Sequence, residues 1–208
     1  MPRTLALGSC MLLTGLLALS ACSDATGPDG GIAYVQVTIT DAPADYYETA
    51  EVWISRVYLA ESEEGDGGGQ VDLFNDPTAP KHYDLLTLRD GITADLTDVV
   101  EVEAGQYGQL RLVVDRAAIT LKEPYTFSDG SQSRTLAVPS GHETGIKVLL
   151  KEEFDAGDGT LTDLLVDFDV NRNFVIQGSP GTPAGIQDIL FTPTLTEMHR
   201  TVEPTPEE

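Results

Sequence analysis

Cysteine, histidine and basic residues are all scarce in this chain of 208 residues, and each scarcity excludes a class of function. The three histidines, His82, His142 and His199, lack the short spacing that a zinc site on one element needs, so we expect each at the surface. The chain has 12 lysines and arginines and 34 aspartates and glutamates, which gives a net charge of -22. Because a nucleic-acid backbone is bound by clustered cations, the sequence predicts no nucleic-acid partner.

Signatures of catalysis are missing as well. Ser140 and His142 lie close together, but their flanks are not the G-x-S-x-G of a nucleophile elbow and no helix is expected after them. Acids are abundant, yet nothing in the pattern marks a desolvated pair suited to glycoside cleavage. The sequence therefore predicts that the protein is not an enzyme, with an envelope hydrolase as the weakest alternative.

An export signal occupies the N-terminus. Residues 4–23 carry no charge, and an apolar run from Leu5 to Leu19 ends in Leu19-Ser20-Ala21-Cys22, which resembles a bacterial lipobox. A membrane helix needs about 20 apolar residues, whereas this run is shorter and contains glycine and serine. Cys10 has a similar local pattern but sits too early to follow a hydrophobic core. We predict a lipoprotein signal peptide over residues 1–21 and lipidation of Cys22.

The predicted cleavage defines the mature chain and its location. It leaves Cys22 as the single cysteine, and lipidation of its sulfur leaves neither a disulfide nor a free thiol. Residues 22–31, rich in glycine and aspartate, read as a flexible tether. We expect a membrane partner through the lipid anchor on Cys22 in the cell envelope, and Ser23 after the cysteine favours the outer over the inner membrane.

The remaining sequence alternates with the period of β-strands. Val35, Val37 and Ile39 fall on one face of a first strand, and a second strand at 51–59 shifts phase as it would across a bulge. No amphipathic helical segment of 12 residues appears, although residues 93–100 could hold a short helix. The sequence predicts an all-β, antiparallel β-sandwich, transthyretin-like or immunoglobulin-like, of about seven to nine strands. Further strands are expected at 71–74, 83–88, 99–102, 109–114, 118–121, 135–138, 146–150, 161–170 and 189–195.

Several short motifs carry a family resemblance. They are Thr40-Asp41-Ala42-Pro43, Ala104-Gly105-Gln106-Tyr107, Val138-Pro139-Ser140-Gly141, Gly145-Ile146-Lys147-Val148 and Val166-Asp167-Phe168-Asp169. In this order they resemble the domain of unknown function family 4382, over about residues 32–197. The resemblance implies an exported, usually lipid-anchored all-β domain with a turn like that of transthyretin-like and carboxypeptidase-regulatory sandwiches, and it implies no reaction. Residues 198–208 are predicted to form a frayed acidic tail.

A row of carboxylates is the most distinctive candidate site. Strand alternation at 161–170 places Asp163, Asp167 and Asp169 on the face opposite the core. If residues 146–150 and 161–170 form a hairpin, Lys147 falls near Leu165 or Asp167, and Arg111 lies on the polar phase of its own strand. The first interpretation is a structural ion network of Arg111, Lys147, Asp167 and Asp169.

The alternative interpretation of the carboxylates is a metal site. Asp41, Asp167 and Asp169 could supply oxygen ligands to Ca²⁺, which takes six to eight of them. Lys147 would repel such a cation, and the acidic turn at 155–159 lacks the spacing of an EF-hand loop. Apart from this possible Ca²⁺, the sequence predicts no cofactor.

The aromatic residues give a second, weaker candidate surface. Trp53 and Tyr58, with Tyr46 and Tyr47, could bind a glycan or a protein, but packing in the core or at its rim is the favoured interpretation. The predicted function is a non-catalytic binding or structural module of the envelope. A Ca²⁺-dependent adhesion or ligand-binding module is the main alternative, and the partner, envelope protein or glycan, stays open.

Overall fold

Strands make up nearly all regular structure in the computed structural model, which describes residues 30–41, 44–60, 69–139, 145–182 and 185–205. The predicted signal peptide and Cys22 lie outside these ranges. No helix within them is long and apolar enough to cross a membrane. The strands are β1 (Ile32–Thr40), β2 (Tyr47–Ala60), β3 (Gln70–Asn75), β4 (Lys81–Asp84), β5 (Ala94–Asp95), β6 (Val100–Glu103), β7 (Gly105–Tyr107), β8 (Gln109–Leu121), β9 (Ser133–Leu136), β10 (Ile146–Leu149), β11 (Phe154–Ala156), β12 (Thr160–Asp167), β13 (Phe174–Gly178), β14 (Ile186–Phe191) and β15 (Leu195–Pro204). Two short helical turns are η1 (Leu85–Thr87) and α2 (Val170–Asn173).

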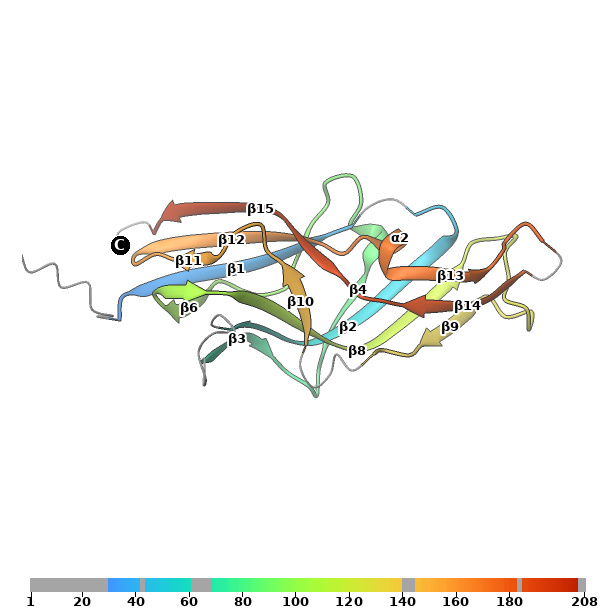
Figure 1. Ribbon diagram of the computed structural model, residues 1–208, viewed down its shortest axis with the longest axis horizontal. Coiled ribbons are helices and arrows are strands. Elements are labelled where there is room, and N and C mark those ends of the chain that lie inside the picture. Colours follow the sequence, from blue (N-terminus) through green and yellow to red (C-terminus); the bar gives the residue numbers. More distant parts are fainter. Residues whose placement is uncertain (1–29, 42–43, 61–68, 140–144, 183–184, 206–208) are drawn as a thin grey trace, which may run out of the picture.

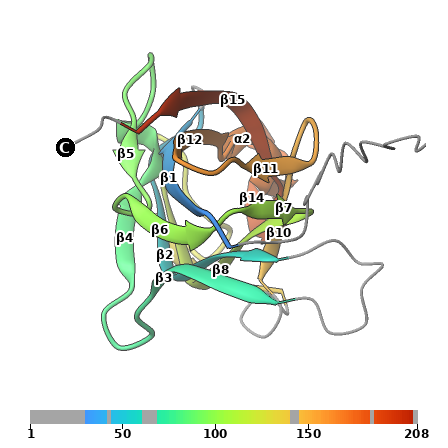
Figure 2. The ribbon, with the colours of Figure 1, turned by 90° about the vertical axis from the view of Figure 1, so that its left-hand side faces the viewer.

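One large sheet curls around the core. Its strand order is β3-β2-β8-β10-β15-β12-β1-β5, with β4 also on β2, β9 on β8 and β6 on β1. Figures 1 and 2 show the resulting sandwich-like shape, in which β2 and β8 face β1 and β12 across the interior. Two smaller sheets complete it, β7 with β11 and β13 with β14.

The expected all-β, sandwich-like fold is confirmed, but the pairing is mixed. β1 pairs in parallel with β12, and β10 pairs in parallel with β15. The sandwich is therefore not purely antiparallel. The sequence did not indicate this, because strands that pair in parallel are joined by long crossovers and no local pattern identifies the partner strand. The described residues form fifteen strands where seven to nine were expected, since several two- to four-residue strands add to the long ones.

Alternation of side chains builds the core as predicted. Val35, Val37 and Ile39 of β1 are fully buried, as are Leu164 and Val166 of β12. Because the two strands lie side by side in register, their apolar faces form one continuous layer. The phase shift expected in the second strand is confirmed, as the β2–β8 register shifts between residues 53 and 56.

Two predicted elements are wrong. The short helix expected at 93–100 is replaced by β5 and the start of β6, both of which pair with β1. The tail expected from 198 is instead part of β15, which pairs with β12 as far as Pro204. In both places an open strand edge supplies backbone hydrogen bonds that local composition does not announce.

The first and last described strands meet at one end of the molecule. The amide of Gly159 donates to the carbonyl of Ile32 at 2.8 Å, and the amide of Thr205 donates to the carbonyl of Gly159 at 2.8 Å. We call this the terminal end. β9, β13 and β14 lie at the opposite extreme of the long axis, which we call the far end (Figure 1).

Candidate functional site

Asp41, Asp167 and Asp169 lie where β1 and β12 end side by side. Thr40 is in register with Asp167. Asp41, only 6% exposed, accepts a hydrogen bond at Oδ1 from the amide of Val170 at 2.9 Å. Asp169 caps α2, accepting from the amide of Arg172 at 3.2 Å. Asp41 and Asp169 thus serve the backbone of the turn that follows β12.

The predicted hairpin between residues 146–150 and 161–170 is wrong. β15 lies between β10 and β12, so Lys147 faces neither Leu165 nor Asp167. Lys147 is in register with Arg111 of β8. The cause is the connecting segment, which forms β11 and pairs with β7 instead of turning back directly.

The ion network was expected from a pairing of β10 with β12, and these two strands are not neighbours in the sheet. A cation beside the carboxylates is Arg172, whose Nε lies 3.7 Å from Asp169 Oδ2. It also acts electrostatically on Asp167. Sequence reasoning missed Arg172, although its spacing of three residues from Asp169 was a usable signal for contact across one helical turn.

The calcium interpretation finds no ligand cluster in the described ranges. No three or more histidine, cysteine, aspartate or glutamate side chains there are grouped so that they could hold a metal ion. The positions of Asp41 and Asp169 fit the alternative use as hydrogen-bond acceptors for backbone amides. The guanidinium of Arg172 further opposes a cation beside Asp169.

Burial affects two carboxylates on the outer face of β12. It raises the pKa of Asp167 above its ordinary value, with Asp169 adding to the rise and Arg172 opposing it. Burial also raises the pKa of Asp163, while the Thr38 hydroxyl, which donates to its carboxylate at 3.4 Å, opposes the rise. The folded protein therefore holds both protons more tightly than the unfolded chain does.

The difference in the pKa of Asp167 between the folded and the unfolded chain predicts a pH-dependent effect of Asp167→Asn. At a pH above the raised pKa, the ionised carboxylate of Asp167 lowers the free energy of unfolding. At a pH below the ordinary pKa of 3.8 the carboxyl group is protonated in both the folded and the unfolded state, so this destabilisation disappears. We expect the variant to melt at a higher temperature than the wild type at pH 7 and at the same temperature near pH 3. Thermal denaturation followed by circular dichroism measures both.

Asp76→Asn is the control of opposite sign. Hydrogen bonds from Thr78 and Ala79 lower the pKa of Asp76, so its ionised form stabilises the fold above pH 3.8, and this contribution is lost as the pH falls. We expect this variant to melt at a lower temperature at pH 7. A lower melting temperature for Asp167→Asn at pH 7 would contradict the assignment.

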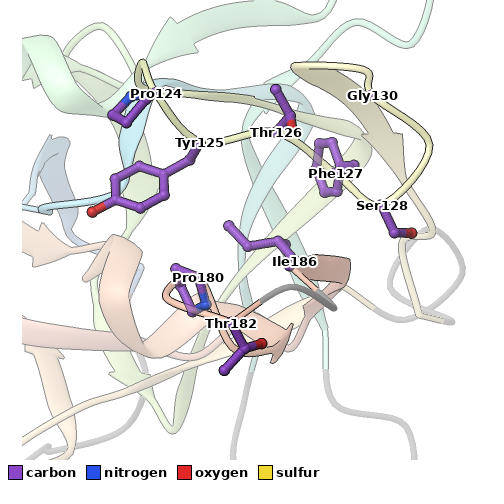
Figure 3. Close-up of a pocket in the computed structure, with 10 residues that line it drawn as sticks. Pro124, Tyr125, Thr126, Phe127, Ser128, Gly130, Pro180, Thr182 and Ile186 are labelled. Atoms are coloured by element: carbon purple, nitrogen blue, oxygen red, sulfur yellow. The ribbon is translucent and has the colours of Figure 1, made fainter.

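Two cavities open among the elements of the far end. The first, of about 460 Å³, opens between the segment 124–130 and residues 180–182 and 185–186. In Figure 3, Tyr125, Thr126 and Phe127 come from one segment, and Pro180, Thr182 and Ile186 from the other. The Phe127 ring is nearly fully buried beneath the guanidinium of Arg134, at 4.0 Å. This packing fixes one wall of the cavity.

The second cavity, of about 480 Å³, is a groove between β9 and β14, which we call the β9–β14 groove. Apolar side chains form much of its lining, and an ion pair between Arg134 and Asp188, at 3.1 Å, stands at its edge. Volume and composition are those of sites that bind small molecules or peptide segments. The lining residues are Arg134, Thr135, Leu136, Ala137, Gln177, Asp188, Ile189, Leu190 and Phe191.

Sequence reasoning did not find this groove. It predicted strands near both walls, but it missed β13 and placed the β14 strand three residues late. The apolar run Phe174-Val175-Ile176 was a signal for β13. No sequence signal marks the groove itself, because it forms where two strands fail to pair.

Trp53 is neither in the core nor an open aromatic platform. The guanidinium of Arg116 lies 3.5 Å from the centre of one ring, and the ring of His82 stacks at 4.4 Å. Both flanking residues are register partners of Trp53 on the neighbouring strands β8 and β4. Because the indole lies between two side chains, glycan stacking on Trp53 is not favoured. The half-buried Trp53 packs against neighbouring strands at the rim of the core, which agrees with the favoured expectation of packing in the core or at its rim.

The other sequence candidates have separate places. His82 and His199 are exposed as predicted, whereas Ser140 and His142 lie outside the described residues. Tyr47 is buried and donates its hydroxyl to the carbonyl of Phe174 at 2.6 Å, so it joins β2 to β13.

Comparison with known proteins identifies a family. A family model described as "Domain of unknown function (DUF4382)" matches residues 32–185, which is most of the chain and ends just before β14. This confirms the resemblance seen in the sequence motifs, with a C-terminal boundary earlier than the expected residue 197. No curated protein and no solved structure matches the chain. The chain belongs to the DUF4382 family.

Proposed function

We propose that the protein is a non-catalytic binding or structural module, anchored on the cell envelope at the outer membrane by lipid on Cys22. The observation that carries the proposal is the placement of the two cavities described above. β1 begins at the terminal end, whereas both cavities lie among the strands and loops of the far end. A tether over residues 22–31 therefore presents the cavities away from the membrane surface.

The chemistry of these two cavities supports binding over catalysis. Among the described residues, those that line them include a single carboxylate, Asp188, and neither histidine nor cysteine. The carboxylate of Asp188 is already paired with the guanidinium of Arg134 at 3.1 Å. Such a lining suits recognition by shape and hydrogen bonding.

The anchor is tested by replacing Cys22 with serine in the full chain. We expect the wild-type protein to incorporate labelled palmitate and to fractionate with the outer membrane, because the thiol accepts the lipid. Cys22→Ser should lose the label completely and accumulate as the larger precursor. Metabolic labelling, membrane fractionation and immunoblotting measure these outcomes.

Cys10→Ser is the matched control, since Cys10 has the rival lipobox-like pattern. It should keep both the label and the location. Label retained in Cys22→Ser, or lost in Cys10→Ser, would overturn the anchor assignment. Label in the inner membrane alone would overturn only the choice of membrane.

A further inference from the structure

The large sheet is interrupted at the far end. β10 and β9 both pair with β8, and β14 leads along the chain into β15. β10 and β15 are hydrogen-bonded to each other, but within the described ranges β9 pairs with β8 alone. β14 pairs with β13 and, at its first residue Ile186, forms one bridge to Phe127. The ladder that joins β10 to β15 thus stops before it reaches β9 and β14, which line the two sides of the groove.

Side chains fasten the two strands at one point. Arg134 of β9 donates from Nη1 to the carbonyl of Gln187 at 2.9 Å and to Asp188 Oδ1 at 3.1 Å, both on β14. Leu136 and Ala137 on one side and Leu190 and Phe191 on the other line the groove beyond this tie. An open strand edge beside an apolar groove pairs readily with another extended chain.

Leu190 is the apolar residue that an occupant would cover. It is 52% exposed, although its neighbours Ile189 and Phe191 are 4% and 1% exposed. A segment laid along the groove removes this side chain from water and extends the interrupted ladder.

The negative charge at the edge of the groove favours a basic occupant. Asp129 and Asp188 share the single guanidinium of Arg134, and their side chains are 58% and 61% exposed. The chain as a whole carries a charge of -22. A basic partner is therefore attracted to this edge, and an acidic one is repelled.

We propose that the β9–β14 groove binds an extended peptide, with alternating apolar side chains and flanking basic residues, as an added strand. Backbone hydrogen bonds to the strand edges supply affinity, and the apolar lining accepts every second side chain. The inference rests on the proposed function as a binding module and names its partner class.

The probe is a seven-residue peptide in which three valines alternate with two threonines between terminal lysines, capped at both ends and carrying a fluorophore. It is titrated against the mature lipidated protein in detergent, with binding followed by anisotropy. We expect saturable binding, and slower hydrogen exchange of β9 and β14 amides in the complex. An analogue N-methylated at alternate amides should not bind, and a glutamate-flanked analogue should bind more weakly.

Two variants and one control locate the binding. Leu190→Lys places a charge in the groove and Ala137→Trp fills it, so each should weaken binding about tenfold or more. Val202→Lys changes an equally exposed residue of β15, 53% exposed, outside the groove, and should leave affinity unchanged. Equal affinity of Leu190→Lys and wild type would overturn the assignment.

Other outcomes have separate meanings. Binding that survives N-methylation identifies a small-molecule type of site and overturns strand addition. A dimer that excludes the peptide makes a second copy the occupant and also overturns the proposal. Absence of binding in a protein that is lipidated and correctly located overturns the groove assignment alone. Cleavage of the peptide, read by mass spectrometry, contradicts the non-catalytic function, while loss of the anchor does not affect the binding measurement.

Discussion

Replacement of Arg200 by methionine is expected to lower the free energy of unfolding by about 3 to 5 kcal/mol, because it leaves a buried carboxylate without its cation. Arg200 Nη2 lies 2.8 Å from Glu197 Oε2, and the Glu197 side chain is only 3% exposed. The same guanidinium donates to the carbonyls of Glu152 and Glu153, both at 3.1 Å. The variant therefore also releases the segment that leads from β10 to β11.

Arg172→Met is the matched control for this effect. It breaks another arginine–acid pair at the same sequence spacing, but the Arg172 side chain is 75% exposed and lies 3.7 Å from Asp169. We expect a change below about 1 kcal/mol, as for surface ion pairs in general. Urea denaturation of both variants measures the difference. Equal losses would show that burial is not what makes the Arg200–Glu197 pair important.

Phe191→Ala is expected to lower the free energy of unfolding by about 3 to 5 kcal/mol, the usual cost of deleting a buried aromatic ring. Phe191 is 1% exposed. Its ring lies 6.2 Å from that of Phe168 and 5.0 Å from that of Phe174, centre to centre. These contacts join the β13–β14 pair to the segment that follows β12. Chemical denaturation gives the loss, and hydrogen exchange should show early opening of β13 and β14.

The neighbouring residue provides the control. Leu190→Ala, on the same strand but 52% exposed, should cost less than about 1 kcal/mol. A loss as large as that of Phe191→Ala would mean that Leu190 is covered in solution, for example by a second copy.

The faces of individual strands were predictable, because one buried face imposes a period of two on the sequence. Leu164 and Val166 fall toward the core and Asp163 and Asp167 away from it, as alternation predicts. The partners of these strands were not predictable. The hairpin that was to bring Lys147 beside Asp167 failed because register between distant strands depends on every intervening element, here β11 and β15.

The candidate sites divide in the same way. Strand phase and loop position suggested that Asp41, Asp167 and Asp169 lie in one region, and Asp41 does contact the turn after β12. Their use as backbone acceptors was not predictable, because it depends on the local geometry of that turn. The groove was equally hidden, since Leu136 and Leu190 read as ordinary strand residues.

The parallel pairing of β1 with β12 also determines when the fold can be completed. The Asp41–Val170 hydrogen bond joins positions 129 residues apart. Because a chain is made from its N-terminus, β5 and β6 can cover one edge of β1 early, but the other edge waits for β12. A chain interrupted before residue 160 would keep a valine- and isoleucine-rich edge of β1 open to pairing with other chains.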